Sequence, residues 1–302
     1  MRVTVQVPAT SANLGPGFDA LGLALSLHND VVATAADRLT VEIQGEGATS
    51  LPRDERNVVV RGVRLAFDEA GRPWTGCALT CINRIPTARG LGSSAAAWVG
   101  GLVAGNALLG SPLSQDVVLT LAARAEGHPD NVAAAVLGGL TVSCGTDDGA
   151  LAVKVPVPTA LRWIVLVPEV SSSTAEARAV LPASVPRADA VFNVQRVALL
   201  LAALQAGRTD ALAAALADRL HQPYREALFP WAPAVTAAAR RAGALGCVLS
   251  GAGPSLLAVV TGHPDPVARA MESALAGVGL AGAARTLGVD VTGATWRAAD
   301  SV

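Results

Sequence analysis

Residues 91–110 constrain the fold of this chain more than any other segment, because the stretch is almost uncharged and about as long as a helix that crosses a bilayer. Its residues are mostly Gly, Ala and Ser rather than Leu, Ile and Phe, no aromatic belts flank it, and Asn106 lies within it. A helix buried in the core of a soluble protein needs the same composition. We therefore predict a buried helix over residues 94–109 and no association with a membrane.

The charge balance argues against a polyanionic partner. The chain has 23 Lys and Arg residues against 24 Asp and Glu residues, for a formal net charge of −1, so it lacks the positive field that holds nucleic acid. We expect no nucleic-acid partner. Lys154 is the only lysine, and any mechanism that needs an active-site lysine depends on that one side chain.

The composition is that of a folded protein from a reducing compartment. Hydrophobic residues make up 51% of the chain and charged residues 16%, which excludes disorder caused by low hydrophobicity and high net charge. Four cysteines lie mostly in apolar stretches without CxxC or metal-ligand spacing. The N-terminus lacks the basic and apolar regions of a secretion signal, so we expect a cytoplasmic protein.

Apolar and polar residues alternate in three early segments, with the period of half-buried strands. These segments are residues 2–8, 39–44 and 77–83. After the buried helix, two further helical patterns run from Ser114 or Asp116 to about residue 125 and over residues 132–137. The first half of the chain therefore mixes strands and helices.

Residues 145–158 contain Asp, Gly and spaced prolines without a helical period, which predicts a domain boundary near residue 155. We assign residues 1–155 to an N-terminal domain and residues 156–302 to a C-terminal domain. The elements expected in the second domain are helices over 190–205, 209–221, 233–242 and 266–275, and strands over 163–167, 247–250, 256–261 and within 283–296. This order predicts an α+β domain with helices against one face of an antiparallel sheet.

A glycine-containing loop that leads into a helix, PTARGLGSSAA at residues 86–96, is the most informative motif. Glycines let backbone amides approach an anion, and the start of a helix supplies free N–H groups and a positive dipole end. The hydroxyls of Ser93 and Ser94 can cap the helix, bind phosphate or ligate magnesium. The motif indicates a phosphate site, although an ordinary strand-to-helix turn with a serine cap has the same composition.

Two familiar nucleotide-binding patterns do not explain this loop. The pattern GxGxxA occurs both at residues 90–95 and at residues 15–20, and a dinucleotide fold also needs an acidic residue at the end of the next strand. Pro86 interrupts the approach to the loop, and Asp116 falls in an expected helix. The pattern GxxxxGK[ST] is absent from the sequence, so phosphate binding would rest on backbone amides and Arg89.

A second cluster, EGHPDN at residues 126–131, places two carboxylates, an imidazole and an amide between two expected helices. Glu126 would lie beside the phosphate helix if those helices pack together, where its carboxylate could hold magnesium that bridges nucleotide phosphates. The alternative is that Asp130 caps the next helix and Glu126 is a solvated terminal residue.

Three further segments are candidates for binding a polar substrate. In PATSANLGPGFD, Asn13 and Asp19 follow the first strand, although both residue types also form turns. SGAGPS at residues 250–255 forms either a hairpin turn or a second loop that supports the phosphate site. Arg178 and Arg225 lie in polar settings, and each could place a guanidinium fork on a carboxylate.

Taken in order, PATSANLGPGFD, PTARGLGSSAA, EGHPDN and SGAGPS resemble the signature motifs of the GHMP small-molecule kinases, and most closely those of homoserine kinases. The resemblance covers nearly the whole chain and extends to STAEARAVLP and HQPYR. It implies the α+β two-domain GHMP kinase fold, with a left-handed βαβ unit in the N-terminal domain, a ferredoxin-like C-terminal domain and ATP between them. It also implies a homodimer and the ATP-dependent phosphorylation of L-homoserine to O-phospho-L-homoserine in threonine biosynthesis.

The resemblance also assigns the nucleotide site. Ser94 and Glu126 would ligate Mg²⁺. The residues that would wrap the phosphates are Pro86, Thr87, Ala88, Arg89, Gly90, Leu91, Gly92, Ser93, Ser94, Ala95 and Ala96.

For the substrate, the resemblance implies that the amino and carboxylate groups of homoserine meet four side chains and that Asn131 lies near the acceptor hydroxyl. The four are Asn13, Asp19, Arg178 and Arg225. The chemistry agrees, because a zwitterionic amino acid needs an anion for its ammonium group and guanidinium groups for its carboxylate.

Some related kinases place an aspartate and a lysine at the acceptor hydroxyl. Here Lys154 lies in an expected linker, so we predict catalysis mainly by positioning and electrostatics, with Asn131 near the reacting groups and the hydroxyl proton passing to the γ-phosphate. Asp130 is the one carboxylate that could still act as a base.

Two other functions are compatible with parts of the sequence. Another kinase of the same superfamily would phosphorylate mevalonate, a shikimate-type alcohol or a sugar, but these substrates lack the ammonium group that Asp19 would bind. A regulatory protein that binds a nucleotide or an amino acid would keep the loops without turnover, but it would not need the pair of Ser94 and Glu126 to hold magnesium.

Overall fold

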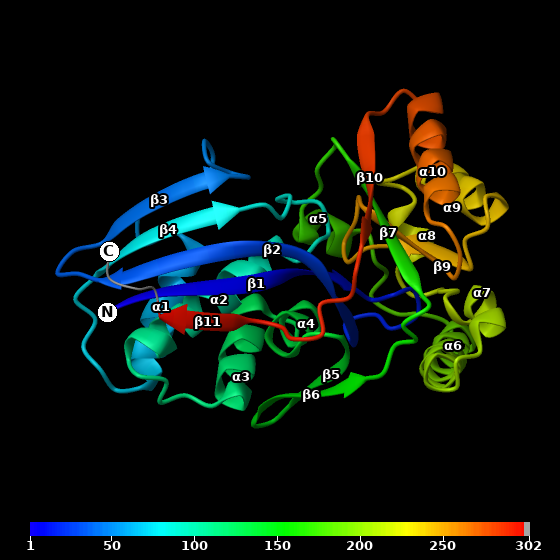
Figure 1. The fold of residues 1–302 in the computed structure, drawn as a ribbon. Helices are drawn as coiled ribbons and strands as arrows, with labels where there is room; N and C mark the ends of the chain where they lie inside the picture. The colour runs from blue at the N-terminus through cyan, green and yellow to red at the C-terminus, as the bar shows by residue number, and fades with distance from the viewer. Residues whose placement is uncertain (299–302) are drawn as a thin grey trace.

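The computed structural model describes residues 1–298, which fold around two β-sheets, one toward each end of the molecule (Figure 1). The larger sheet has the strand order β11-β1-β2-β4-β3, and β5 and β6 extend from β2. Its strands are β1 (Arg2–Ala12), β2 (Leu21–Ala35), β3 (Thr40–Gly45), β4 (Cys77–Asn83), β5 (Leu140–Thr146), β6 (Gly149–Val155) and β11 (Thr295–Ala298).

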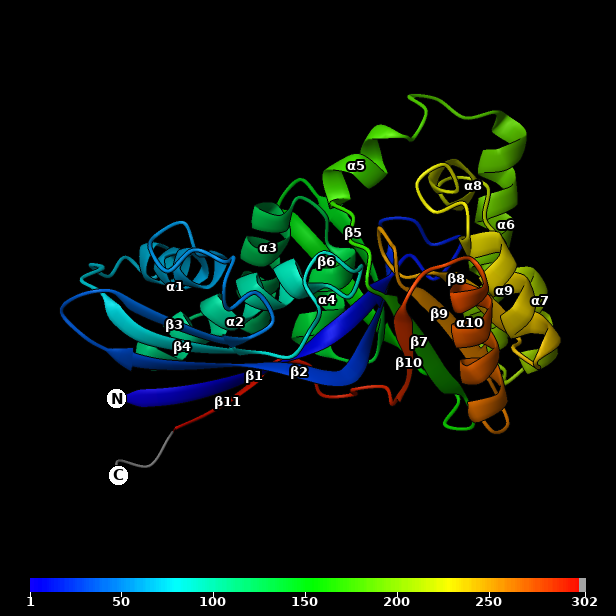
Figure 2. The same ribbon diagram turned by 90° about the horizontal axis from the view of Figure 1, so that it is seen from above.

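Four helices cover one face of the larger sheet (Figure 2). They are α1 (Val58–Glu69), α2 (Ser93–Leu108), α3 (Gln115–Glu126) and α4 (Asp130–Leu137). The alternation expected in the first strand is confirmed, because Val3, Val5 and Val7 are fully buried between more exposed neighbours. The helix expected over residues 94–109 is α2, whose small Gly and Ala residues lie buried where the helix packs against α1 and β1.

The smaller sheet has the order β10-β7-β9-β8, and all of its neighbouring strands are antiparallel. Its strands are β7 (Arg162–Pro168), β8 (Gly246–Leu249), β9 (Leu256–Val260) and β10 (Gly282–Leu287). Helices α9 (Ala232–Arg241) and α10 (Asp265–Gly277) share a second apolar core with these strands. The elements follow one another as a strand, helices, two strands, a helix and a strand. This order is the split βαβ arrangement of a ferredoxin-like domain, as the resemblance implies.

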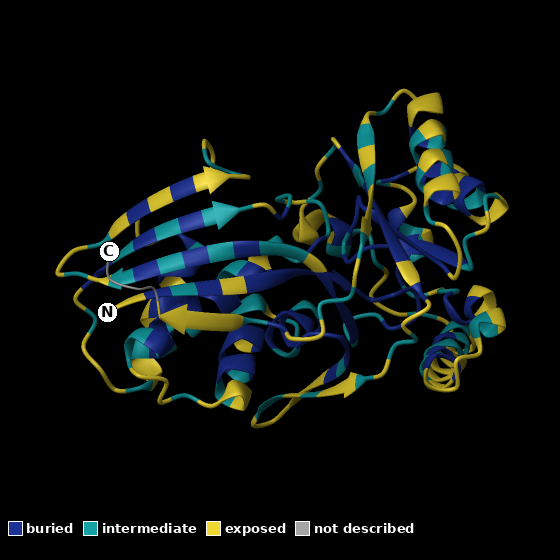
Figure 3. Ribbon diagram, in the orientation of Figure 1, coloured by how far each residue is buried: buried dark blue, intermediate teal, exposed yellow. Residues whose placement is uncertain are grey.

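Further helical elements join β7 to α9. They are α5 (Thr174–Ala179), α6 (Arg187–Gln205), the 3₁₀ helix η1 (Thr209–Ala211), α7 (Leu212–Ala215) and α8 (Gln222–Arg225). Figure 3 shows that the central strands of both sheets are buried, whereas exposed residues gather on the outer helices and the loops. Among residues 1–298, every helix falls short of the length and hydrophobicity that a membrane span requires.

The structure differs from two expectations about the course of the chain. Strand β11 pairs with β1, with Trp296 opposite Val5, so the last strand joins the first sheet rather than the domain assigned to residues 156–302. The segment expected as a linker is instead part of the β5–β6 hairpin, and Lys154 lies on β6 opposite Thr141. The division of the chain near residue 155 stays a prediction.

The prediction of one continuous helix over residues 209–221 is also wrong, because the observed helical segment stops early. Helix α7 ends at Ala215. The carboxylate of Asp218 then accepts hydrogen bonds from the backbone N–H groups of Leu220, His221 and Gln222. Aspartate competes in this way for backbone donors that would otherwise continue a helix, and here it starts α8 instead.

Strand β2 and helix α1 have no counterpart among the predictions. The first five residues of β2 are all buried, so the strand lacks alternation at its start. Helix α1 begins with three valines, which favour strands. This helix joins the parallel strands β3 and β4, and the left hand of that crossover stays a prediction.

The close packing of α1 on α2 depends on glycine. A Cβ atom at Gly101 would overlap the carbonyl oxygen of Val59, and one at Gly62 would lie 2.8 Å from the carbonyl oxygen of Trp98. We predict that Gly101→Ala lowers the free energy of unfolding by about 2 kcal/mol or more, because the two helix backbones must separate. Urea denaturation measures this loss.

The control is Gly277→Ala in α10, where a Cβ atom meets no other atom within 4 Å. This substitution should be neutral or slightly stabilising, because alanine has the higher helix propensity. Equal losses in the two variants would contradict the packing argument.

Candidate active site

The candidate residues converge on one cavity of about 270 Å³. Its walls come from the loop after β1, the loop before α2, the turn between α3 and α4, residues 172–178, α8 and the turn between β8 and β9. The sequence-predicted residues that line it include Asn13, Asp19, Ser94, Glu126, Asp130, Asn131, Arg178 and Arg225. Segments from both halves of the chain therefore build a single site.

The loop before α2 ends in a turn that leaves the start of the helix open. Gly90 and Gly92 have φ angles of 72° and 67°, which glycine adopts without strain. Gly92 is the N-cap of α2, and no side chain caps this terminus, so the serine-capped turn considered above is excluded. The first N–H groups of α2 are available to an anion.

Most of the expected phosphate loop lines the cavity. The lining residues are Pro86, Ala88, Arg89, Gly90, Leu91, Gly92, Ser93 and Ser94. Thr87, Ala95 and Ala96 do not line it, and Ala95 and Ala96 are buried in the core because this part of α2 packs against the sheet.

The side chain of Arg89 secures the loop to the second sheet. Its guanidinium donates to the carbonyl oxygens of Pro168 at 2.9 Å and Glu169 at 2.6 Å, both at the end of β7. The backbone N–H of Ser172 also donates to the carbonyl oxygen of Ala88 at 3.2 Å. Phosphate binding by this loop would therefore rest mainly on backbone N–H groups rather than on the guanidinium of Arg89.

Ser94 and Glu126 face each other beside the start of α2. The hydroxyl of Ser94 donates to Glu126 Oε2 at 2.7 Å, so α2 and α3 pack as the sequence suggests. Burial raises the pKa of the Glu126 carboxyl, and the hydrogen bond from Ser94 offsets only part of that effect. Within residues 1–298 no group of three or more His, Cys, Asp and Glu residues could hold a metal ion, so a metal here would need further ligands from a bound nucleotide.

Asp130 organises the turn between α3 and α4. Its Oδ1 atom accepts hydrogen bonds from His128 Nδ1 at 2.7 Å and from the backbone N–H of Asn131 at 2.6 Å. The hydrogen bond to this carboxylate raises the pKa of His128. Asn131 Oδ1 accepts a hydrogen bond from the Thr10 hydroxyl at 2.7 Å, which leaves the amide N–H₂ of Asn131 as the group that can donate to a ligand.

Asp19 and Arg178 form a two-pronged ion pair at the cavity wall. Arg178 donates from Nη1 to Asp19 Oδ2 at 3.0 Å and from Nη2 to Oδ1 at 2.7 Å. Asn13 holds the loop of Asp19 in place, because its Oδ1 accepts the backbone N–H of Asp19 at 3.0 Å and its Nδ2 donates to the carbonyl oxygen of Gly251 at 2.9 Å. The sequence places both charged groups near one ligand but does not reveal that they pair with each other.

Arg225 is a buried cation on α8, with 2% of its surface exposed. Its Nε donates to the carbonyl oxygen of Ala177 at 3.1 Å, and its Nη1 donates to that of Gly251 at 3.0 Å. Burial and the nearby positive charge of Arg178 lower the pKa of Arg225 to about 10. The guanidinium therefore stays charged at neutral pH.

The turn between β8 and β9 supports the site from the second sheet. The hydroxyl of Ser250 donates to the carbonyl oxygen of Gly90 at 2.6 Å. The backbone N–H of Gly251 donates to the carbonyl oxygen of Ala12 at 3.1 Å. The segment SGAGPS is thus both a hairpin turn and a support for the phosphate loop and the loop after β1.

Sequence reasoning missed several residues of the site. His128 was recognised in its cluster but given no role, and Thr10 was named only as part of its motif. Phe18 and His221 stand within their motifs without an assigned role, although the ring centroid of Phe18 lies 5.6 Å from the guanidinium carbon of Arg178. The only signal in the sequence for a role of these two residues is that Phe18 precedes Asp19 in PATSANLGPGFD and that His221 shares the segment HQPYR with Arg225.

Comparison with known proteins agrees with this geometry. Models of the N-terminal and C-terminal domains of GHMP kinases match residues 57–139 and 200–277. The homoserine kinase of Moorella thermoacetica is 46% identical over 276 residues, which cover 91% of this chain and 93% of the relative. The homoserine kinase of Trichormus variabilis is 45% identical over 296 residues, which cover 97% and 98%.

Solved structures show the same similarity. The crystal structure of homoserine kinase from Cytophaga hutchinsonii matches with a TM-score of 0.89 and 31% identity, over 98% of this chain and 97% of that chain. The structure of L. major mevalonate kinase in complex with R-mevalonate matches with a TM-score of 0.67 and 18% identity over 90% of each chain, which shows a shared fold.

The contact between the loop and Asn131 leads to a testable prediction. A Cβ atom at Gly92 would overlap the Thr10 hydroxyl and lie 3.1 Å from Asn131 Oδ1. We predict that Gly92→Ala weakens ATP binding about tenfold or more, because the added methyl group must displace this hydrogen-bonded pair or the loop. Isothermal titration calorimetry measures the affinity.

Gly110→Ala is the matched control. Gly110 has a comparable φ of 84°, but a Cβ atom there meets no other atom within 4 Å. ATP affinity should stay the same in this variant. A similar loss in both variants would show that backbone strain, rather than crowding of Thr10 and Asn131, weakens binding.

Proposed function

The chain belongs to the homoserine kinase family of the GHMP kinases, and we propose that the cavity described above is where it transfers the γ-phosphoryl group of ATP to the side-chain hydroxyl of L-homoserine. The product is O-phospho-L-homoserine, and the reaction is a step of threonine biosynthesis. The observation that carries this assignment is the meeting of one carboxylate and two guanidinium groups, from Asp19, Arg178 and Arg225, at one cavity beside an open helix N-terminus.

The open start of α2 is the proposed phosphate site. Gly90 and Gly92 bring backbone N–H groups close to an anion without interference from side chains, and the dipole of α2 favours negative charge at this end. The other residues of the loop that line the cavity would enclose the phosphates from the side. ATP in this position would lie between the segments contributed by the two sheets.

Ser94 and Glu126 are the proposed Mg²⁺ ligands. Both offer hard oxygen atoms, they lie 2.7 Å apart beside the phosphate site, and burial raises the pKa of the Glu126 carboxyl, which a cation would stabilise in its charged form. When bound, the ion would neutralise charge on the nucleotide phosphates. Magnesium usually takes one or two protein ligands and completes its shell with phosphate oxygens and water, which fits a site with two protein oxygens.

The ion pair of Asp19 and Arg178 is the proposed site for the zwitterionic part of the substrate. An α-ammonium group can bind Asp19 while an α-carboxylate binds Arg178, so one internal ion pair is exchanged for two contacts with the ligand. Arg225 provides a second guanidinium for the same carboxylate. Alcohols without an ammonium group, such as mevalonate or a sugar, cannot form an ion pair with Asp19.

Catalysis is proposed to rest on positioning. Lys154 donates its ammonium hydrogens to the carbonyl oxygens of Leu137 and Val291, and it does not line the cavity. Asn131 would donate its amide N–H to the acceptor oxygen or to the γ-phosphate, and His128, with its raised pKa, would place positive charge nearby. The hydroxyl proton would pass to an oxygen of the transferred phosphoryl group.

The test of the function is magnesium-dependent release of ADP with L-homoserine, L-serine, L-threonine and mevalonate offered separately at equal concentration. L-Homoserine should stimulate release most strongly. Arg178→Ala and Arg225→Ala should each raise the KM for homoserine about tenfold or more, because a charged hydrogen bond to the carboxylate is lost. ATP binding without stimulation by any acceptor would instead favour a regulatory binding protein.

Asp130 is proposed to orient Asn131 and His128 rather than to remove the proton, because its Oδ1 atom already accepts hydrogen bonds from both residues. Asp130→Asn should therefore lower kcat no more than about tenfold, whereas loss of a general base costs about a hundredfold or more. Steady-state kinetics measure the effect.

A companion variant is Thr10→Val, which removes the hydroxyl that holds Asn131 Oδ1. A loss of kcat comparable to that of Asp130→Asn is expected, because Asn131 Nδ2 lies 3.4 Å from Asp130 Oδ1, so each variant weakens one contact of the same side-chain amide. A hundredfold loss confined to Asp130→Asn would identify Asp130 as the base.

A further inference from the structure

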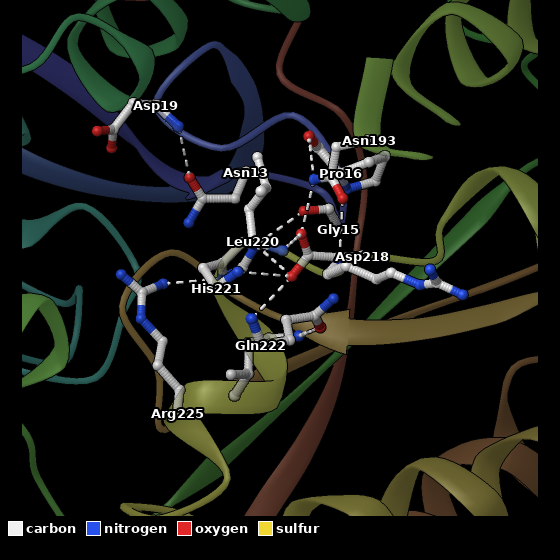
Figure 4. Close-up of polar contacts among 12 residues, drawn as sticks. Asn13, Gly15, Pro16, Asp19, Asn193, Asp218, Leu220, His221, Gln222 and Arg225 are labelled. Carbon is white, nitrogen blue, oxygen red and sulfur yellow. Dashed lines mark hydrogen bonds and ion pairs between the residues drawn. The ribbon is translucent and has the colours of Figure 1, made fainter. Parts of the chain in front are cut away.

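His221 lies fully buried next to Arg225, and none of the roles above involves it. Its Nε2 atom lies 2.7 Å from the carbonyl oxygen of Gly15, and its Nδ1 atom lies 3.0 Å from Arg225 Nη1. Figure 4 shows the imidazole between the loop after β1 and the guanidinium of Arg225 on α8. The ring therefore connects two segments that are more than 200 residues apart in the sequence, since Gly15 and His221 differ by 206 positions.

These two contacts fix the tautomer of the imidazole. A carbonyl oxygen only accepts, so Nε2 carries the proton, and Nδ1 presents a lone pair that accepts a hydrogen bond from Arg225. Burial lowers the pKa of His221; the carboxylate of Asp218 opposes this effect, and the positive charge of Arg225 adds to it. Asp218 lies 3.4 Å from Nε2, but its carboxylate accepts hydrogen bonds from the backbone N–H groups at the start of α8. The neutral ring is thus an acceptor for Arg225.

The N–H donors of Arg225 show how the acceptor Nδ1 of His221 helps to fix the orientation of the guanidinium. A guanidinium group has five N–H donors. The Nε donor binds the carbonyl oxygen of Ala177, and the Nη1 donors bind the carbonyl oxygen of Gly251 and His221 Nδ1. Within residues 1–298 the Nη2 atom has no hydrogen-bond acceptor, although Arg225 lines the cavity. The protein therefore holds three donors and leaves one edge of the guanidinium for a ligand.

The same histidine is connected to the residues that face the substrate ammonium group. Its ring stacks on Phe18, with 5.2 Å between the ring centroids and an angle of 21° between the planes. Phe18 in turn lies beneath Arg225 at 5.4 Å and Arg178 at 5.6 Å. Phe18 precedes Asp19 in the sequence, so the ring of His221 packs against the loop that carries the substrate-binding carboxylate.

We propose that His221 is a positioning residue for the substrate: by accepting from Arg225 and donating to Gly15, it aims the free edge of Arg225 at the carboxylate of the bound amino acid and keeps that edge at a fixed distance from Asp19. The proposal rests on the function proposed above. It assigns to a buried neutral side chain a part in the selection of substrates that carry an α-carboxylate.

Two substitutions separate the two hydrogen bonds of the ring. In His221→Gln the side-chain amide can reach the place of Nε2 and donate to Gly15, but no acceptor atom remains at the place of Nδ1 to receive the hydrogen bond from Arg225. In His221→Asn the side-chain oxygen takes the place of Nδ1 and can accept from Arg225, while the hydrogen bond to Gly15 is lost. The exposed His263, changed to Gln, is the matched control.

The measurement compares L-homoserine with 3-aminopropan-1-ol, which keeps the hydroxyl and ammonium groups but lacks the carboxylate. The KM or, where turnover is slow, the competitive inhibition constant is determined for both compounds. His221→Gln should raise the value for homoserine about tenfold, as expected for the loss of one hydrogen bond to a charged group, with little change in kcat or in the KM for ATP. The value for 3-aminopropan-1-ol should change far less.

Rescue completes the test. His221→Asn should recover most of the affinity for homoserine, and His263→Gln should leave it at the wild-type value. Equal losses for the two compounds in His221→Gln would overturn the proposal, because a residue with a purely structural role would affect both. If His221→Gln does not fold, His221→Asn decides: a tenfold rise that is equal for homoserine and 3-aminopropan-1-ol at an unchanged melting temperature contradicts the proposal.

A failure of the proposed function is distinguishable from a failure of this inference. If the wild-type enzyme does not phosphorylate homoserine, the function fails, and calorimetric binding of homoserine to the wild type and the two variants tests the histidine separately. If the wild type is active and the variants lose affinity without regard to the carboxylate, only the role of His221 fails.

Discussion

The arrangement of the site depends on the hydrogen bonds that the backbone of Gly251 makes. Its carbonyl oxygen accepts hydrogen bonds from Asn13 Nδ2 and Arg225 Nη1, and its N–H donates to the carbonyl oxygen of Ala12. One residue in a turn of the second sheet therefore holds the loop after β1 and the cation on α8 at the same time. Because these bonds join the two halves of the chain, neither half can present the proposed substrate-binding groups in this geometry alone.

Charges at the cavity are held by partners that keep them in place before any ligand binds. Arg225 is buried but surrounded by carbonyl oxygens, which compensate part of the cost of removing a cation from water. Asp130 receives N–H donors in the same way. The ion pair of Asp19 and Arg178 satisfies two opposite charges that an amino-acid zwitterion can satisfy equally well. Binding then exchanges contacts instead of creating charge that needs new compensation.

The sequence was sufficient for the family, the mixed α+β architecture and the segments that build the cavity, because glycine, charged and amide residues gather in short motifs of an otherwise apolar chain. It was not sufficient to predict which sheet the C-terminal strand joins. The strand around Trp296 looks the same whether it pairs with β10 or with β1, since alternation reports burial on one face and not the identity of the neighbour. His221 was missed for a related reason: a histidine in HQPYR shows no sign of the carbonyl oxygen of Gly15 that orients it.

The position of Lys154 is the reason for proposing that positioning carries much of the chemistry. Its ammonium group joins the end of α4 to the segment before β11 through the carbonyl oxygens of Leu137 and Val291, a structural role away from the cavity. In the proposed mechanism no lysine lies at the acceptor hydroxyl, so stabilisation of the transferred phosphoryl group would fall to donors that are already fixed: the start of α2, Asn131 and the imidazole of His128. A loose transition state demands little activation of the nucleophile and much alignment. The dense hydrogen bonding behind Asn131 and Arg225 is what that alignment requires, because a side chain that must be ordered on binding costs free energy that a pre-ordered one does not.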